Sequence, residues 1–137
     1  MSDIFQTISP IDGTVLFSRR YATTSQIDQC LAQSHQAQQQ WKKVPLVERV
    51  ALVEQFVQKF ASQADSHAEE ICRQMGRPIR YCRGEINGFV QRANTMLELA
   101  PSSLQDIRPG TKKGFQRFIR REPLGVVLCW RHGIIHI

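Results

Sequence analysis

The 137-residue sequence lacks the motifs that mark several common functions. It contains no G-x-G-x-x-G and no P-loop, so it has no glycine-rich turn recognisable as a phosphate cradle. Its four cysteines (Cys30, Cys72, Cys82 and Cys129) form no C-x-x-C pair, and no histidine lies beside them at zinc-ligand spacing. We therefore expect free thiols in a reducing cytosol and predict no metal site.

The sequence also lacks a long apolar run. No uninterrupted stretch is long enough to span a bilayer. We expect no signal peptide, because Asp3 lies near the start and the apolar pair Ile4 and Phe5 is far too short. These features predict a cytoplasmic protein that makes no contact with a membrane.

Acidic residues are few: 12 Asp and Glu stand against 18 Lys and Arg, which gives a net charge of +6. Basic residues gather late in the chain: Arg108, Lys112, Lys113, Arg117, Arg120 and Arg121. With Phe115 and Phe118 among them, this run could bind phosphates and stack on bases. It carries no RNP, helix-turn-helix or zinc-finger signature, so we interpret it as a solvated strand pair and predict no nucleic-acid partner.

The first third of the sequence predicts a hairpin and a helix. Residues 4–8 and 14–17 are β-prone, and the turn residues Pro10, Asp12 and Gly13 lie between them. Thr23 and Gln26 form a capping box that opens a helix. Its apolar face follows steps of three and four: Ile27, Cys30, Leu31, Ser34, Ala37 and Trp41.

Three more amphipathic helices are predicted after this one. Pro45 begins the second helix, where a missing N–H is harmless. Its apolar stripe consists of Leu46, Val50, Val53, Phe56, Val57 and Phe60. A capping box of Ser66 and Glu69 opens the third, which Gly76 ends just before Pro78.

The fourth helix and two strands complete the pattern. The helix covers residues 85–100, and Pro101 ends it. Residues 115–121 predict a short basic strand. Residues 124–129 form the continuous apolar run typical of a strand buried on both faces, which a crossover helix normally follows. The chain therefore resembles the opening of a larger α/β protein whose helices cover a sheet.

Four segments, in order, resemble the aldehyde dehydrogenase superfamily. They are residues 9–15 (Ser-Pro-Ile-Asp-Gly-Thr-Val), 37–41 with 44–49, 75–78 (Met-Gly-Arg-Pro) followed by Glu85, and 121–127 (Arg-Glu-Pro-Leu-Gly-Val-Val). The last is the most specific, because in the family it leads into the dinucleotide-binding strand. The resemblance covers nearly the whole chain up to Leu128. It implies a modified Rossmann cofactor domain, a catalytic domain and a small oligomerisation arm.

By this resemblance, residues 1–137 are an incomplete N-terminal part of the cofactor-binding domain of an α/β protein. Residues 108–123 begin the oligomerisation arm, and 114–122 contribute to its β-structure. Such an arm adds strands to a neighbouring sheet, so its exposed backbone groups make it adhesive when alone. The resemblance therefore implies a homo-oligomer, or association with an intact homologue.

The family's chemistry implies residues that this chain does not contain. A cysteine thiolate attacks the aldehyde, a hydride passes to NAD or NADP, and a glutamate activates water for hydrolysis. No residue here matches a catalytic or cofactor-binding position of the family, so we assign none. We expect the full-length protein to oxidise an aldehyde to a carboxylic acid. This chain alone should be inactive and should bind the cofactor and the aldehyde poorly.

Residues 129–137 suggest an out-of-frame tail. One permitted back-translation of residues 130–137, read one base out of frame, spells Ala-Pro-Trp-Asn-Tyr-Pro-Tyr. In the family, Ala-Pro-Trp-Asn-Tyr-Pro follows the strand at the cofactor site, and its asparagine helps to hold the oxyanion. Here that codon falls across Gly133 and Ile134. We therefore expect a natural frameshift or a sequencing error after Leu128; the alternative is an unrelated tail.

Three remaining candidate sites have simpler interpretations. His132 and His136 have a spacing that suits a metal on a helix, but Gly133 disfavours that helix and no third ligand is near. His35 and His67 lie on polar helix faces and should be solvated. Cys129 follows an apolar strand without a base nearby, so we expect an inert thiol.

Two functional alternatives stay open beside the enzyme fragment. The chain could be a non-enzymatic interaction module that binds an intact relative through its arm, or, on charge alone, a nucleic-acid-binding domain. In either case the four apolar helix faces lack partners, and we predict that the isolated chain self-associates.

Overall fold

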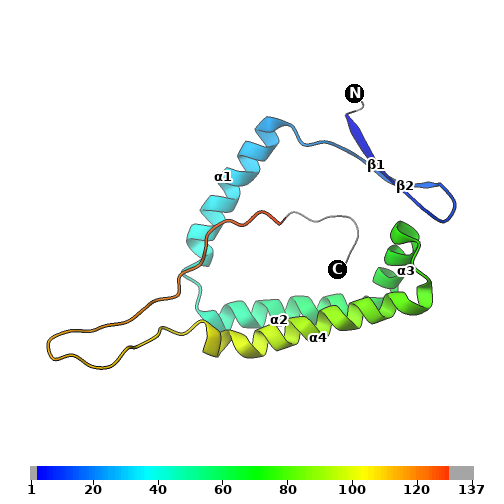
Figure 1. The fold of residues 1–137 in the computed structure, drawn as a ribbon. Coiled ribbons are helices and arrows are strands. Elements are labelled where there is room, and N and C mark those ends of the chain that lie inside the picture. Colours follow the sequence, from blue (N-terminus) through cyan, green and yellow to red (C-terminus); the bar gives the residue numbers. More distant parts are fainter. Residues whose placement is uncertain (1–2, 130–137) are drawn as a thin grey trace.

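The computed structural model describes residues 3–129 and places the elements around an open frame (Figure 1). In chain order they are β1 (Ile4–Ile8), β2 (Val15–Arg20), α1 (Thr24–Trp41), α2 (Leu46–Ser62), α3 (Ala64–Met75) and α4 (Ile79–Ser103). Helices α2 and α4 run antiparallel along one side, α3 lies at one end of this pair, and α1 rises from the other. The hairpin lies across the frame from α1, beside the turn that follows α3 (Figure 1).

The predicted hairpin is confirmed. Strands β1 and β2 pair antiparallel, with Thr7 opposite Phe17. The pairing register shifts between Thr7 and Ile8. Across the turn, the N–H of Ser9 donates to the carbonyl of Thr14 at 2.8 Å. Gly13 takes a left-handed conformation with φ of 74°, which explains the glycine at this position. Strand β2 runs three residues further than predicted.

The start of α1 is also confirmed. The Thr23 hydroxyl accepts the Gln26 N–H at 3.2 Å, and the Gln26 side chain accepts the Thr23 N–H at 2.9 Å. Two amides that the helix leaves unbonded are thereby satisfied. The apolar face of α1 is uncovered, however: no residue of the helix is buried, and Ile27 and Leu31 are about half exposed.

The small core lies where α2, α3 and α4 meet. Val57 of α2, Ala68 of α3 and Ile86 of α4 are buried there. Phe60 and Phe89 pack edge to face, with ring centroids 4.7 Å apart. Aromatic pairs in this geometry stabilise beyond their burial alone. This three-helix corner is therefore the best-packed part of the described chain.

The predicted start of α3 is wrong. The helix begins at Ala64, and Ser66 and Glu69 lie inside it rather than forming a cap. Only Gln63 separates α2 from α3, so the N–H of His67 already bonds to the Gln63 carbonyl at 3.0 Å. The end is as predicted: Gly76 is left-handed, and its N–H donates to the Cys72 carbonyl at 2.8 Å.

Helix α4 is longer than the predicted range of 85–100 at both ends. It begins directly after Pro78, because burial of Cys82 and Ile86 against the neighbouring helices favours six further helical residues. It also continues through Pro101, and the N–H of Leu104 donates to the Ala100 carbonyl at 3.0 Å. Pro101 removes one hydrogen bond without stopping the last turn. At the start of α2, by contrast, Pro45 lies one position from its predicted place, as the N-cap.

Neither of the two late strands forms as predicted. Residues 115–121 make only isolated bridges, Ile107 with Ile119 and Lys112 with Phe115. Residues 124–129 carry no strand, and Leu124 and Leu128 are 96% and 82% exposed. A strand buried on both faces needs neighbouring strands and two helix layers, and residues 3–129 do not supply them. The predictions for residues 130–137, including His132 and His136, fall outside the described residues.

Candidate functional site

Within residues 3–129, no three His, Cys, Asp or Glu side chains gather to form a metal site. No helix of this part combines the length and apolar character that crossing a membrane requires. Three surfaces of this part of the chain are open to contact with other segments. They are a groove between α2 and α4, the apolar side of α1, and the arm (residues 108–123).

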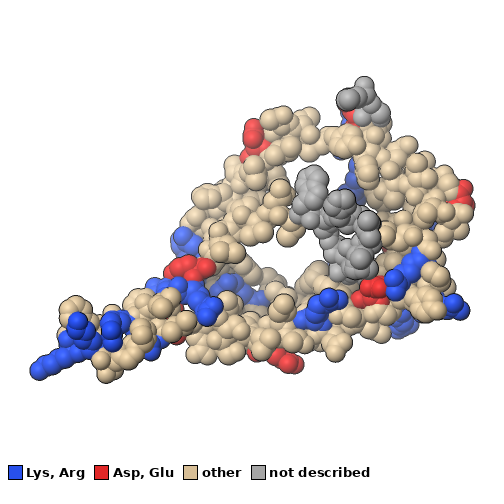
Figure 2. Space-filling view, viewed as in Figure 1, with Lys and Arg blue, Asp and Glu red and all other residues tan. Residues whose placement is uncertain are grey.

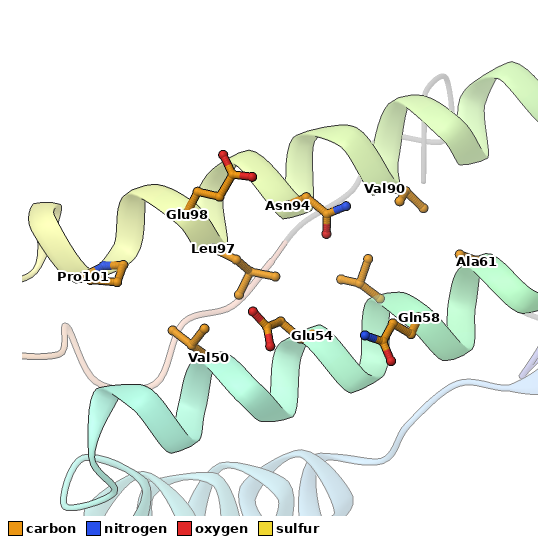
Figure 3. Close-up of a pocket in the computed structure, with 10 residues that line it drawn as sticks. Val50, Glu54, Gln58, Ala61, Val90, Asn94, Leu97, Glu98 and Pro101 are labelled. Carbon is orange, nitrogen blue, oxygen red and sulfur yellow. The ribbon is translucent and has the colours of Figure 1, made fainter.

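The groove between α2 and α4 is an open hollow of about 520 Å³ (Figure 3). Apolar side chains such as Val57, Val90 and Leu97 line its floor, and Glu54 and Glu98 add carboxylates. Its lining contains no cysteine, histidine or serine that could act as a nucleophile or base. The groove is therefore a mainly apolar contact surface that also carries two carboxylates.

The apolar side of α1 faces residues 125 and 126. Ala37, Trp41, Val44 and Val126 contribute to a shallow, mainly apolar hollow of about 640 Å³. The run 124–129 thus returns along α1, which Figure 1 shows as the orange segment beside that helix. Both sides of this contact are largely exposed, so the surface is incomplete as a protein core.

The arm projects from the frame and carries much of the positive charge (Figure 2). Within it, Arg117 donates to the Gly110 carbonyl at 2.6 Å, and the Arg120 guanidinium lies 4.8 Å from the centre of the Phe118 ring. The Lys112 ammonium is 5.1 Å from the Phe115 ring. Several cations are thus already engaged within the arm, which supports the interpretation of a structural element.

Two titratable groups have shifted pKa values. Hydrogen bonds from Ser9 and then Thr14 lower the pKa of the Asp12 carboxyl in the hairpin turn. Burial raises the pKa of the Cys82 thiol, which lies against the carbonyls of Arg77 and Pro78. Neither group lies in one of the three surfaces, so the shifts report on folding rather than catalysis.

Among the individual cysteine and histidine side chains, some are exposed and one is turned inward. Cys129 and His35 are exposed, the latter as predicted, and Cys30 is exposed although it was expected on the inner face of α1. His67 was predicted to be solvated, and this is wrong. It stacks on Phe60 with ring centroids 4.2 Å apart, and its Nε2 atom is buried. The short connection between α2 and α3 turns it inward.

Comparison with known proteins gives a single consistent result. The model of the aldehyde dehydrogenase family matches residues 1–130. A malonate-semialdehyde dehydrogenase of Bacillus licheniformis is 27% identical over 126 residues, covering 89% of this chain and 25% of that protein. An N-succinylglutamate 5-semialdehyde dehydrogenase of Pseudomonas fluorescens is 26% identical over 129 residues, covering 91% and 25%.

Solved structures give the same result for the fold. An indole-3-acetaldehyde dehydrogenase of P. syringae, in complex with NAD+, superposes with a TM-score of 0.80 at 24% identity, covering 90% of this chain and 25% of that one. An NAD-dependent benzaldehyde dehydrogenase of Corynebacterium glutamicum gives 0.72 at 17% identity, covering 81% and 24%. The chain therefore spans about a quarter of the length of the proteins it matches.

Proposed function

The chain belongs to the aldehyde dehydrogenase family, and we propose that it is the N-terminal part of an NAD(P)-dependent enzyme that oxidises an aldehyde to an acid. Its role there is structural: α1, α2 and α4 cover the sheet of the cofactor domain. The family match over residues 1–130 supports this proposal most strongly. The uncovered face of α1 and the exposed run 124–129 supply the surfaces that such a sheet would bury.

The described residues do not fit the nicotinamide cofactor. Bound pyrophosphate needs free backbone N–H groups at a helix N-terminus. The Thr23 side chain already accepts the Gln26 N–H at the start of α1, and no G-x-G-x-x-G turn, which would let a pyrophosphate approach the backbone, precedes α2 or α4. Helix α3 follows α2 after one residue. We therefore assign no chemical step to this chain and propose that it is inactive alone.

The direct test is an assay of the purified chain with NAD+ or NADP+ and several aldehydes. We expect no formation of reduced nicotinamide above that of a buffer control. An intact aldehyde dehydrogenase from the same cells provides the positive control. Turnover by the chain alone would overturn the proposed inactivity.

A second candidate function is that of a non-enzymatic interaction module, acting in the cytoplasm. The observation in its favour is the projecting arm, in which Phe115, Phe118 and Ile119 are exposed and only isolated bridges form. Backbone groups left unpaired in this way accept a strand from another chain. A stable complex with an intact homologue, lost when residues 108–123 are deleted, would support this role. Salt-sensitive binding to random oligonucleotides would favour nucleic acid instead.

We also propose that residues 129–137 are read out of frame. The support is the shifted spelling Ala-Pro-Trp-Asn-Tyr-Pro-Tyr in a permitted back-translation of residues 130–137. Resequencing the gene across the Leu128 codon tests the proposal. An intact frame with no remnant of the family sequence downstream would show that the tail is unrelated.

A further inference from the structure

Two cysteines lie on either side of the turn that joins α3 to α4. Cys72 is in the last turn of α3, and its carbonyl accepts the N–H of Gly76 at 2.8 Å. Cys82 is in the first turn of α4, and its Sγ atom lies 3.4 Å from the Arg77 carbonyl and 3.5 Å from that of Pro78. The backbone of Cys72 and the sulfur of Cys82 therefore both contact the same three-residue turn, between two helices that pack together.

The two thiols differ in access to solvent. Cys72 is partly exposed, whereas Cys82 is 0% exposed. Burial is the main cause that raises the pKa of the Cys82 thiol. Repulsion from negative charge on Cys72 raises this pKa further, whereas the Arg77 guanidinium lowers it. The other two cysteines, Cys30 on α1 and Cys129 beyond the arm, are exposed and belong to other parts of the chain.

We propose that Cys72 and Cys82 form an oxidisable dithiol, which closes to an intramolecular disulfide when the protein meets a disulfide oxidant such as glutathione disulfide. The pair lies outside the three contact surfaces, so this site is independent of the family's chemistry. The disulfide would join α3 to α4 across the turn that Gly76 makes. It would act as a redox-controlled link within the three-helix corner.

The difference in exposure sets the order of the reaction. The thiolate of Cys72 attacks one sulfur of glutathione disulfide, forming a mixed disulfide and releasing one glutathione thiolate. The released glutathione thiolate then takes the proton of the Cys82 thiol, and the Cys82 sulfur attacks the Cys72 sulfur, displacing the second glutathione. Two protein thiols are oxidised and one glutathione disulfide is reduced to two glutathiones. Cys82 cannot react first, because its sulfur is closed to an external oxidant.

The test is peptide mapping by mass spectrometry after the whole chain is treated with glutathione disulfide and quenched with acid. We expect the peptides of Cys72 and Cys82 to be joined, with loss of the mass of two hydrogen atoms and no retained glutathione. Cys30 and Cys129 should carry glutathione adducts instead. Retained glutathione on Cys72 of the unmodified protein would overturn the proposal, as would a failure of Cys72 to react while Cys30 does.

Variants separate the two steps. In Cys82→Ser, glutathione should stay on Cys72; the serine hydroxyl can still donate to the turn carbonyls, and Cys82→Ala serves as a second variant if that one misfolds. Cys30→Ser is the matched control and should leave the Cys72–Cys82 disulfide unchanged.

The same oxidation in concentrated urea should lose the preference for this pair, because the pairing depends on the folded helices. An unchanged preference in urea would show that closeness in sequence alone explains it, and would overturn the structural proposal.

Discussion

Gly76 lies directly against the ring of Pro10. A Cβ atom built on Gly76 would be 3.0 Å from the Cγ atom of Pro10, and Gly76 itself has a left-handed φ of 68°. The tip of the hairpin thus meets the turn between α3 and α4, although 66 positions separate the two residues in the sequence. This contact joins the N-terminal hairpin to the three-helix corner.

Replacement of Gly76 by alanine should loosen this corner. The left-handed backbone costs an L-residue about 1–2 kcal/mol, and the new methyl group would press on Pro10. We expect amides in the peptide covering residues 64–82 to exchange with deuterium about tenfold faster, the ratio that corresponds to ~1.4 kcal/mol.

Gly84→Ala is the matched control for this change. Gly84 lies in α4 with ordinary helical geometry, and nothing is within 4 Å of a Cβ placed there. Alanine should therefore slow local exchange, since it favours a helix by about 0.5–1 kcal/mol over glycine. Equal effects of the two variants would contradict the role given to Gly76.

Removal of the Thr23 hydroxyl should fray α1. Thr23→Ala abolishes the bond to the Gln26 N–H, and loss of an N-cap weakens a helix by about 1 kcal/mol. Because no residue of α1 is buried, packing cannot compensate. We expect faster exchange confined to the first two turns of α1, measured by deuterium uptake. Thr24→Ala, one residue inside the helix, should leave exchange there unchanged or slower; a loss as large as that of Thr23→Ala would exclude the capping explanation.

The hairpin turn should lose stability in acid. Hydrogen bonds from Ser9 and Thr14 lower the pKa of Asp12 in the folded chain below its ordinary value of 3.8. A lowered folded pKa means that the stabilisation is fully present above 3.8 and is lost as pH falls through the folded value. The amide resonance of Thr14, which donates to the Asp12 carboxylate at 3.1 Å, should report the change.

Asp12→Asn provides the control for this titration. The amide oxygen can still accept the Thr14 N–H, but it has no charge to lose in this pH range. Its Thr14 resonance should therefore be flat from neutral pH down to strongly acidic solution. A midpoint at or above 3.8 in the unmodified chain would contradict the assignment.

The isolated chain should self-associate through its uncovered apolar surfaces. Among residues 3–129, Leu124 and Leu128 are the most exposed large apolar side chains, and they adjoin the hollow on α1. Replacing both with serine should shift the chain toward lower mass in light scattering at a given concentration, since less apolar area is available for association. Replacing two already polar residues of α1, Gln29 and Gln33, with serine should not. A monomer that unfolds sharply and reversibly without these changes would contradict the prediction.

Much of the secondary structure could be predicted because its signals are local. The capping box joins Thr23 to a residue three positions away, and the left-handed Gly76 ends its helix through a bond to Cys72. The turn around Asp12 is likewise closed by residues within the hairpin. Each of these features depends only on residues that are close in the sequence. The sequence was therefore sufficient to predict them.

The misplaced boundaries have a different cause. The start of α4 at Ile79 follows from burial of Cys82 and Ile86. The short connection between α2 and α3 turns His67 inward, where its ring stacks on Phe60. The apolar run 124–129 shows the reverse case: its pattern is that of a buried strand, yet within residues 3–129 only a shallow contact with α1 partly covers it. The apolar pattern shows which side chains the segment can bury. It does not show whether neighbouring strands and helices are present to cover them.

The sequence alone was enough to predict a family resemblance, a hairpin, the ends of two helices, and a basic arm without a recognisable nucleic-acid motif. Only the tertiary structure decided that Pro10 meets Gly76, that Cys72 and Cys82 border the same turn, and that α1 keeps its apolar face uncovered. The physical reason is the range of the forces involved. Caps and turns are hydrogen bonds closed over a few residues, whereas burial depends on segments that meet only after the chain has folded.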